Sequence, residues 1–466
     1  MRSLVLFRND LRVADNPALT AAAARGEVLP VFVYEPEAYG EAAKWWLHHS
    51  LTGLAQDLGG LMVRQGDPLA VVEGLVADYG VDAVFWNRRY DPAGIAKDTE
   101  MKAALGAAGV TVESFPGNLL FEPWQIKTGS GGQFKVFSPF WRACLREAAP
   151  AAALERPSLA VFGAAAEIDA LDLLPRKPDW STGFGPIWTP GEKGAWARLA
   201  HFLSDDIKGY KTGRDRPDQT HVSRLSPHLH FGEISPRQIW REVQHQCAMY
   251  PSKQGDADKF LAEIGWREFS HQLLFHTPDL PEQNLNRAFD AYPWADNPDH
   301  LTAWQKGQTG YPLVDAGMRE LWHTGYMHNR VRMVVASFLI KHLRIHWQHG
   351  MNWFWDTLLD ADLANNTASW QWVAGSGADA APYFRIFNPT TQAQKFDPNG
   401  DYIRKWCPEL AALPTKVLHA PWEAPALVLQ ESGVTLGETY PHPIVDHKEA
   451  RAAALAGYDT VKSSQR

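Results

Sequence analysis

Residues 3–34 read SLVLFRNDLRVADNPALTAAAARGEVLPVFVY, two apolar runs on either side of an amphipathic stretch. Such runs are typical of buried strands, and a strand followed by a helix and a second strand is the repeating unit of a parallel sheet. Further apolar runs follow within the first 127 residues, at 61–65, 82–87 and 110–115. We therefore expect an α/β N-terminal domain with a parallel, Rossmann-like sheet.

After residue 127 the sequence changes character twice. TGSGGQ at 128–133 indicates a break, and the segment from about 134 to 195 is rich in Ala, Pro and Gly, as in a long connector. Apolar residues at three- and four-residue spacing then predict helices over 235–247, 259–275, 313–323, 333–347 and 353–359. We expect an α/β domain at 1–130, a connector at 131–198 and an all-helical domain at 199–462.

Composition limits the class of protein. The 466 residues are 45% hydrophobic, enough for a large core. Cys144, Cys247 and Cys407 form no CxxC pair, which excludes a disulfide framework and a four-cysteine cluster and indicates a reducing compartment. No apolar run is long enough to span a bilayer, so we expect a cytoplasmic protein. The net charge of −8 neither implies nor excludes a nucleic acid partner.

The nucleotide-binding motifs give a mixed result. Neither GxGxxG after the first strand nor GxxxxGK[ST] occurs, so an ordinary dinucleotide or P-loop site is unsupported. The segment THVSRLSPHLHFGEIS (220–235) places Ser223 and Ser226 around Arg224 ahead of a helix. It could hold a diphosphate through hydroxyl and amide donors, or it could be a plain turn with capping serines.

The stretch DADLANNTASWQW (360–372) concentrates carboxylates, amides and indoles. Asp360 and Asp362 fit a divalent metal site or a capped helix start, and the lack of a nearby His makes the metal site the less favoured of the two. If Asp362 caps a helix, Asn366 and Trp370 lie four residues apart on one face. An amide beside a flat indole suits a ring-shaped ligand, and the alternative is a buried amide that satisfies backbone groups.

Two upstream segments supply further polar side chains. GYMHNRVRMVVASF (325–338) carries two arginines just before an apolar helix, and an Arg near Asp360 would form a charge-assisted pair. EIGWREFSHQLL (263–274) carries Glu263, Trp266 and Arg267 on successive turns. Such a mixture is seen where an aromatic face meets a polar ligand.

Together these motifs resemble those of the DNA photolyase and cryptochrome family. The matching stretches are FRNDLRVADNPAL (7–19), HVSRLSPHLHFGEIS (221–235), WREF (266–269) and two long blocks at 309–343 and 360–406. They cover almost the whole chain. The resemblance implies FAD bound noncovalently inside the helical domain.

The resemblance also implies the residues that would bind FAD. Its phosphates and ribityl chain would be held by Tyr210 and by the run Val222, Ser223, Arg224, Leu225 and Ser226. Arg332 and Asp360 would pair beside the isoalloxazine, with Asp362 at the flavin edge and Asn366 facing flavin N5. The run departs from the family's TSRLS at Val222, which supplies no hydroxyl and puts one phosphate contact in doubt.

Trp370, Trp347 and Trp294 match the inner, middle and outer members of the family's tryptophan relay. Electron tunnelling decays steeply with distance, so a chain of indoles replaces one long jump by short hops. Where many relatives read NNGGWQW, this chain has Thr367, Ala368 and Ser369 before Trp370. The surroundings of the inner indole therefore differ.

The resemblance implies a lesion cavity as well. Trp266 and Trp372 would flank a pyrimidine dimer after it leaves the duplex, an event that costs least at a damaged step. Glu263 would hydrogen-bond the dimer's base edge. The remaining cavity and DNA contacts would be Asn329, Met333, Arg267, Arg330 and Gln392.

Within the family, several features favour the cyclobutane pyrimidine dimer (CPD) as substrate. (6-4) photolyases carry a histidine pair at the positions of Asn329 and Met333, and insect-type cryptochromes typically carry cysteine at the position of Asn366. No long tail follows Arg466, which argues against a signalling cryptochrome. The implied reaction starts when light excites FADH⁻. One electron passes to the dimer, two cyclobutane bonds split, and the electron returns.

Three alternatives stay open: a blue-light-sensing cryptochrome, a (6-4) photolyase and an NADPH-dependent flavin oxidoreductase. The lesion-cavity residues discriminate against the first, because a pure sensor has no use for them. WWLHHSL (45–51) resembles the plant-cryptochrome-like class III branch, and the antenna chromophore could be folate, a deazaflavin or absent. We expect UV-damaged DNA as the partner of a monomer with no metal, no membrane contact and no obligate protein partner.

Overall fold

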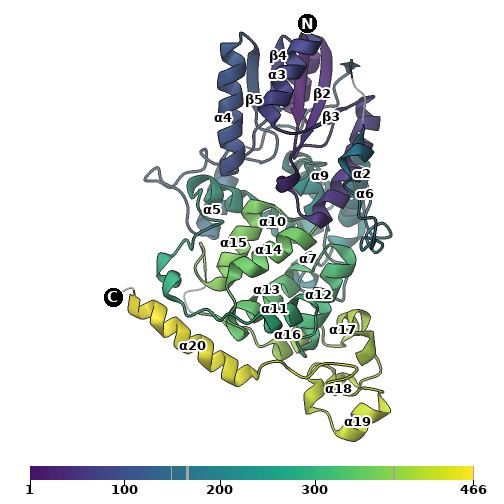
Figure 1. Cartoon of the computed structure of the whole chain (residues 1–466), viewed down its shortest axis with the longest axis vertical. Coiled ribbons are helices and arrows are strands. Elements are labelled where there is room, and N and C mark those ends of the chain that lie inside the picture. Colours follow the sequence, from purple (N-terminus) through teal and green to yellow (C-terminus); the bar gives the residue numbers. More distant parts are fainter. Residues whose placement is uncertain (148, 164–166, 381–383, 465–466) are drawn as a thin grey trace. The chain divides into compact units, whose positions relative to one another are not determined.

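The computed structural model describes residues 1–147, 149–163, 167–380 and 384–464 and divides into two compact units (Figure 1). The first unit comprises Met1–Lys208, Ser223–Pro278 and Leu359–Ala364. The second comprises Gly209–Val222, Asp279–Leu358 and Asn365–Arg466. Each unit is thus assembled from segments far apart in the chain, and the division into 1–130, 131–198 and 199–462 stays a prediction.

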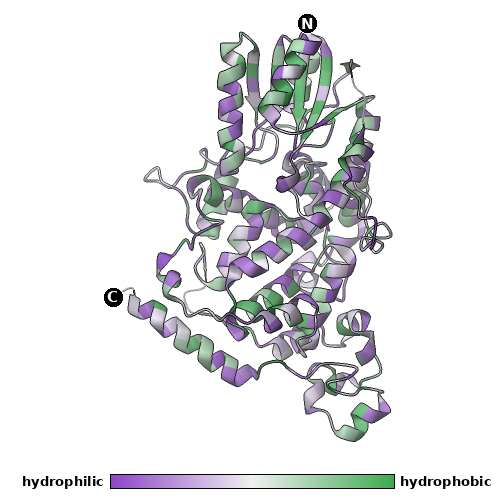
Figure 2. Cartoon of the chain, viewed as in Figure 1, coloured by the Kyte–Doolittle hydropathy of each residue, from purple (hydrophilic) through white to green (hydrophobic). Residues whose placement is uncertain are grey.

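A parallel sheet lies in the first unit, which confirms the expected α/β fold. Its main strands, in the spatial order β3-β2-β1-β4-β5, are β1 (Arg2–Phe7), β2 (Glu27–Tyr34), β3 (Met62–Gln65), β4 (Ala83–Asn87) and β5 (Thr111–Phe115). Leu4 pairs with Leu29 on one side and with Val84 on the other, which fixes the register of the three central strands. Figure 2 shows these strands as predominantly hydrophobic, as buried strands of a parallel sheet should be.

Four helices connect these strands: α1 (Pro17–Arg25), α2 (Glu41–Leu58), α3 (Pro68–Tyr79) and α4 (Pro92–Ala107). Asn16, Asp67 and Asp91 cap α1, α3 and α4 by accepting a hydrogen bond from a backbone N–H of the first turn. Proline follows each cap, because its fixed φ suits the first helical position and its missing N–H costs nothing there. Helix α1 packs on β1 and β4, and α4 packs on β5.

The rest of the first unit is mainly helical. Its helices are α5 (Phe137–Arg146), α6 (Glu192–His201), α8 (Ser226–His230), α9 (Pro236–Met249) and α10 (Gln254–His276). Helix α9 begins with a capping box formed by Ser235 and Gln238, and α10 packs against α5 and α9. Helix α5 and a short strand β6 (Ala160–Val161), which pairs with the start of β2, both lie in the segment expected to be a connector.

The second unit is helical, as expected. Its helices are α7 (Tyr210–Gly213), α11 (Pro298–Gln305), α12 (Pro312–Thr324), α13 (Asn329–Ser337), α14 (Trp347–Thr357), α16 (Pro389–Phe396), α17 (Asp401–Trp406), α18 (Thr415–Leu418), α19 (Ala426–Glu431) and α20 (His447–Ser464), together with most of α15 (Leu363–Ala374). Helix α12 packs against α11, α13, α16 and α17. Helix α20 packs against the 3-10 turn η5 (Arg287–Ala291) and the π-helical turn η6 (Phe338–His342).

The prediction of one helix over 333–347 is wrong. Helix α13 ends at Ser337, the chain passes through the π turn η6, and Arg344 has a positive φ of 55°. Helix α14 then begins afresh after His346, whose side chain accepts a hydrogen bond from the backbone N–H of Gln348. The apolar spacing continues across this break because most of these side chains are buried, whatever path the backbone takes.

Candidate functional site

Helix α10 presents three candidate residues on one face. Glu263, Trp266 and Arg267 are three and four residues apart, so their side chains leave the helix on the same side. The Trp266 ring stacks on Phe137, with centroids 3.9 Å apart and an interplanar angle of 11°. Oε1 of Glu263 lies 3.0 Å from Nζ of Lys259. The stacking fixes the plane of the indole, as a platform for a flat ligand requires.

Arg267 and its neighbour Glu268 join α10 to the loop after β5. Nη1 of Arg267 donates to the carbonyl oxygen of Asn118 at 2.7 Å. Oε2 of Glu268 accepts from the backbone N–H groups of Leu120 and Phe121 at 2.9 and 3.2 Å. Burial raises the pKa of Glu268, and Arg267 and the two N–H groups oppose that shift. Arg267 therefore has a structural contact in addition to its predicted contact with DNA.

One turn further along α10, His271 contacts the candidate Asp362. Nε2 of His271 lies 3.5 Å from Oδ2 of Asp362. Burial alone would raise the pKa of Asp362, but the charges of His271, Arg267 and His230, with a hydrogen bond from His271, lower it well below the ordinary value. His271 was not predicted as a site residue. Its only signal in the sequence is that it follows Arg267 by four residues.

The segment 222–226 has an unusual backbone. Arg224 has a φ of +52°, in the left-handed region that residues other than glycine seldom adopt. Leu225 is buried, and Ser226 is the first residue of α8. A left-handed residue costs on the order of 1–2 kcal/mol and often marks a functional segment. The choice between a binding segment and a plain turn stays a prediction.

Helix α13 carries four candidates, of which Asn329, Arg330 and Met333 are the predicted lesion and DNA contacts. Nη2 of Arg330 donates to Oδ1 of Asp215 at 2.9 Å, and its guanidinium lies 4.4 Å from the ring centroid of Phe396. Nη1 of the same group lies 3.7 Å from the sulfur of Met333. Asn329, the first residue of the helix, is exposed. Arg330 and Met333 therefore lie together, and Asn329 is accessible.

Arg332 and Tyr210 are fixed by contacts within the second unit. Nε of Arg332 donates to the carbonyl oxygen of Met327 at 2.7 Å. Tyr210 begins α7 and is buried, with the Arg214 guanidinium 5.6 Å from its ring centroid. The pairing of Arg332 with Asp360 stays a prediction.

Helix α15 begins at Leu363, directly after Asp362, as the capped-helix interpretation requires. Asn366 and Trp370 are consequently one turn apart. The amide nitrogen of Asn366 donates to the carbonyl oxygen of Met351 at 3.0 Å, and the side chain is almost completely buried. The carbonyl oxygen of the side chain is an acceptor, and the amide nitrogen has a second N–H besides the one bonded to Met351.

The side chain of Trp370 is almost completely buried. It is 2% exposed, and its ring centroid lies 6.2 Å from that of Trp304 and 5.0 Å from that of Phe354, both edge-on. A Cβ at Gly350 would lie only 2.0 Å from Cη2 of Trp370. Trp304 was not singled out in the sequence, because nothing there distinguishes it among 20 tryptophans.

The two other relay candidates, Trp347 and Trp294, both contact the ring of His346. Trp347 is completely buried, and its Nε1 donates to Oδ1 of Asn284 at 2.9 Å. The ring of His346 lies 5.4 Å from that of Trp347 and 4.7 Å from that of Trp294, centroid to centroid. Trp294 is partly exposed, as the outer member of a relay must be. The relay roles themselves stay predictions.

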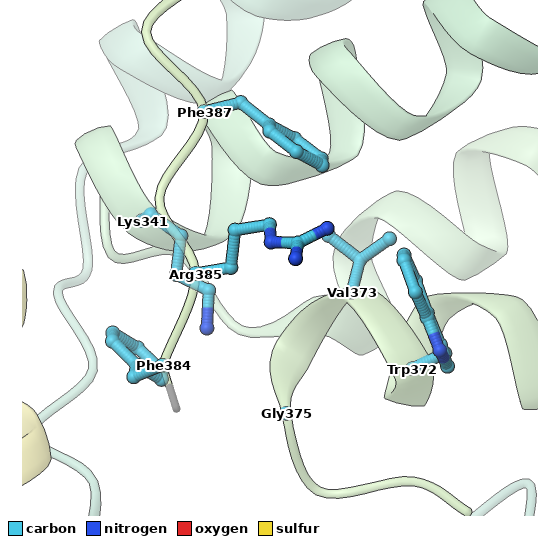
Figure 3. Close-up of a pocket in the computed structure, with 7 residues that line it drawn as sticks. All are labelled: Lys341, Trp372, Val373, Gly375, Phe384, Arg385 and Phe387. Atoms are coloured by element: carbon cyan, nitrogen blue, oxygen red, sulfur yellow. The ribbon is translucent and has the colours of Figure 1, made fainter. Parts of the chain in front are cut away.

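Trp372 lines a cavity together with two basic residues (Figure 3). The other lining residues are Lys341, Val373, Gly375, Phe384, Arg385 and Phe387. Nε1 of Trp372 donates to the carbonyl oxygen of Asp379 at 3.0 Å, which holds the indole in place. Figure 3 shows the Arg385 side chain extending between Phe387 and the pair formed by Val373 and Trp372. Aromatic faces next to cations are the combination that single nucleotides favour. Gln392 lies apart from these lining residues, on the partly buried side of α16.

Neither a candidate metal site nor a candidate membrane-spanning helix is found in the described part of the chain. No group of three or more His, Cys, Asp or Glu side chains in it could hold a metal ion. The helices of these same residues include none with the length and apolar character needed to cross a membrane.

Comparison with known proteins gives two family matches and several close relatives. Residues 3–158 match the family described as DNA photolyase, and residues 260–460 match the FAD binding domain of DNA photolyase. A deoxyribodipyrimidine photo-lyase of Agrobacterium fabrum is 50% identical, covering 99% of this chain and 98% of that protein. Cryptochrome-1 of Arabidopsis thaliana is 40% identical, covering 97% of this chain and 69% of that protein.

Among solved structures, a bacterial class III photolyase from Agrobacterium tumefaciens is similar over 99% of this chain and 98% of its own, with a TM-score of 0.96 and 50% identity. The matched domains make FAD the cofactor that the site must accommodate.

The donor set fits FAD. The hydroxyls of Tyr210, Ser223 and Ser226 can donate hydrogen bonds to the oxygens of a diphosphate. The side-chain oxygens of Asp362 and Asn366 can accept hydrogen bonds from the N–H groups of a flavin ring. Nδ1 of His230, the last residue of α8, has no hydrogen-bond partner among the described residues. An unsatisfied polar atom in this region is consistent with a ligand that completes it.

Proposed function

This chain belongs to the DNA photolyase and cryptochrome family, and on that premise we propose that it repairs cyclobutane pyrimidine dimers in DNA by light-driven electron transfer. FAD in its reduced, light-excited state supplies the electron that splits the dimer. No general acid, base or nucleophile is needed. The work of the protein is therefore to hold the cofactor and the lesion and to keep water and competing groups away.

The observation that carries this proposal is the state of the two tryptophans expected to flank the lesion. Trp266 is stacked on Phe137 and Trp372 is hydrogen-bonded to Asp379, so each indole has a fixed plane. Both side chains are partly exposed. A light sensor that never binds a flipped base has no need of two fixed, accessible indoles, each next to cationic or acidic side chains.

The residues of α13 favour the CPD over the (6-4) product. Asn329 and Met333 stand where (6-4) photolyases carry histidines, and neither side chain can donate a proton to a (6-4) lesion. CPD cleavage needs no such proton. We propose further that the protein acts in the cytoplasm as a monomer, with damaged DNA as its macromolecular partner.

The test uses two duplex oligonucleotides, one with a thymine CPD and one with a (6-4) product. The purified, photoreduced protein is mixed with each, and restored thymine is followed by chromatography under blue light and in darkness. Light-dependent repair of the CPD alone is the expected result. Repair of the (6-4) product would overturn the choice of substrate. Repair of neither lesion, with a flavin that still photoreduces, would favour the cryptochrome alternative.

Two variants test how much Trp372 contributes to the binding of CPD-DNA. Trp372→Ala should weaken CPD-DNA binding by about ten- to a hundredfold, because base-on-indole stacking contributes about 1–3 kcal/mol. Trp322→Ala removes an exposed indole that stacks on Trp353 and lines no cavity described here. It should bind CPD-DNA as the wild type does. Equal affinities of the two variants would contradict the role of Trp372.

A further inference from the structure

His271 on α10 is held between two acceptors. Its Nδ1 lies 3.0 Å from the backbone carbonyl oxygen of Arg267, and its Nε2 lies 3.5 Å from Oδ2 of Asp362. A carbonyl oxygen and a carboxylate oxygen can only accept hydrogen bonds. A neutral imidazole has one N–H and can satisfy only one of them. Both contacts are satisfied together when both ring nitrogens carry a proton, that is, when His271 is an imidazolium.

The charges around His271 agree with that assignment. The acidic groups near it are Asp362 on the segment before α15 and Glu268 on its own helix. The basic groups are Arg267 on α10 and His230 at the end of α8. The pKa of Asp362 is well below its ordinary value, in part through His271 itself, so Asp362 is ionised and can only accept hydrogen bonds. The pKa of His230 is lowered, chiefly by burial, so that second imidazole is the neutral one.

We infer that His271 is a positioning residue of the flavin site, which as an imidazolium keeps Asp362 ionised and fixes the direction of its carboxylate. The inference rests on the proposed placement of Asp362 at the flavin edge. A carboxylate held in this way accepts a hydrogen bond from an N–H donor of the flavin ring, and its direction is set before the cofactor arrives. His271 itself need not touch FAD.

Three variants on α10 test the inference. His271→Gln removes the titratable cation, and His271→Arg replaces it with a permanent one. His276→Gln makes the same substitution at an exposed histidine of the same helix whose Nε2 lies 3.3 Å from the carbonyl oxygen of Pro123. Dissociation constants for FAD are measured by quenching of flavin fluorescence.

His271→Gln should bind FAD about tenfold more weakly than the wild type, the worth of a charge-assisted hydrogen bond. His271→Arg should bind FAD as tightly as the wild type, because it keeps a cation beside Asp362. His276→Gln should also keep the wild-type affinity. Wild-type affinity in His271→Gln would overturn the inference.

A second measurement uses the protein without FAD. Long-range proton–nitrogen correlations in histidine-labelled protein distinguish an imidazolium from either neutral tautomer, and the signal missing from His271→Gln identifies the residue. An imidazolium at about pH 7 is expected, and a neutral tautomer there would overturn the inference. A wild type that retains no FAD would overturn the proposed function as well, whereas normal FAD binding with a neutral His271 overturns only this inference.

Discussion

Replacing Gly350 by alanine should disturb Trp370 more than any other single methyl group added to α14. The added Cβ would lie 2.0 Å from Cη2, 2.4 Å from Cζ3 and 2.6 Å from Cζ2 of the indole. Carbon atoms in contact are normally about 3.5–4.0 Å apart. The indole must therefore move, but Trp304 and Phe354 pack edge-on against it.

Two effects of opposite sign set the magnitude. Overpacking a well-packed core costs about 1–3 kcal/mol, and alanine in place of glycine within a helix gains about 1 kcal/mol. Because the added Cβ would approach a rigid ring, we place the overpacking cost at the upper end of that range. The free energy of unfolding of Gly350→Ala should fall by about 1–2 kcal/mol in urea denaturation. Photoreduction of the flavin under blue light should slow as well, because the displaced indole is the predicted inner relay member.

The control for helix propensity is Gly74→Ala in α3. Gly74 is exposed, and a Cβ there would meet nothing within 4 Å. That variant should gain up to about 1 kcal/mol. The double variant Gly350→Ala/Trp370→Phe should recover part of the lost stability, because the smaller ring makes room. If Gly350→Ala is as stable as the wild type and photoreduces at the same rate, the packing around Trp370 is not as described.

Three more predictions concern the second unit. Trp347→Phe should leave FAD content unchanged but strongly slow photoreduction with an external thiol, measured by flavin absorbance under blue light. Burial and the neighbouring His447 lower the pKa of His342 to about 3. As pH falls, the imidazole of His342 is therefore protonated in the unfolded chain before it is protonated in the folded protein. Between about pH 7 and pH 5 the wild type should therefore lose about 2 kcal/mol of stability that His342→Gln keeps, measured by urea denaturation at both pH values. Lys341 is buried and donates to the carbonyl oxygen of Ala374, and none of the described carboxylates pairs with it. Lys341→Met should therefore keep its free energy of unfolding within about 1 kcal/mol of the wild type or raise it, and a larger loss in thermal unfolding would contradict this.

The sequence predicted those features that depend on local pattern. Five apolar runs became the five main strands, and the central strands β1, β2 and β4 are almost completely buried, which requires apolar residues throughout. Helix α15 begins where the position of Asp362 suggested. The helical break between α13 and α14 could not be predicted, because the side chains remain buried while the backbone changes from α to π geometry.

Contacts between segments far apart in the sequence could not be predicted either. His271 and Asp362 are 91 positions apart, and neither neighbourhood in the sequence indicates the other. Helix α5 was missed because it lies in a segment whose composition is that of a connector, although its apolar residues pack against α10. In both cases the deciding interaction is tertiary, and a single sequence carries no record of it.

The surroundings of the predicted relay show why such contacts matter for function. An indole that gives up an electron becomes a cation, and a fixed positive charge next to it opposes that step by Coulomb repulsion. His346 touches both Trp347 and Trp294 and would be such a charge if protonated. Burial, together with the nearby His349, lowers its pKa to about 4, against the opposing effect of Asp290. His346 is therefore neutral at physiological pH and adds no cation beside the two indoles. Both partners of His271, in contrast, are acceptors, so what each histidine faces decides which hydrogen bonds its ring must make.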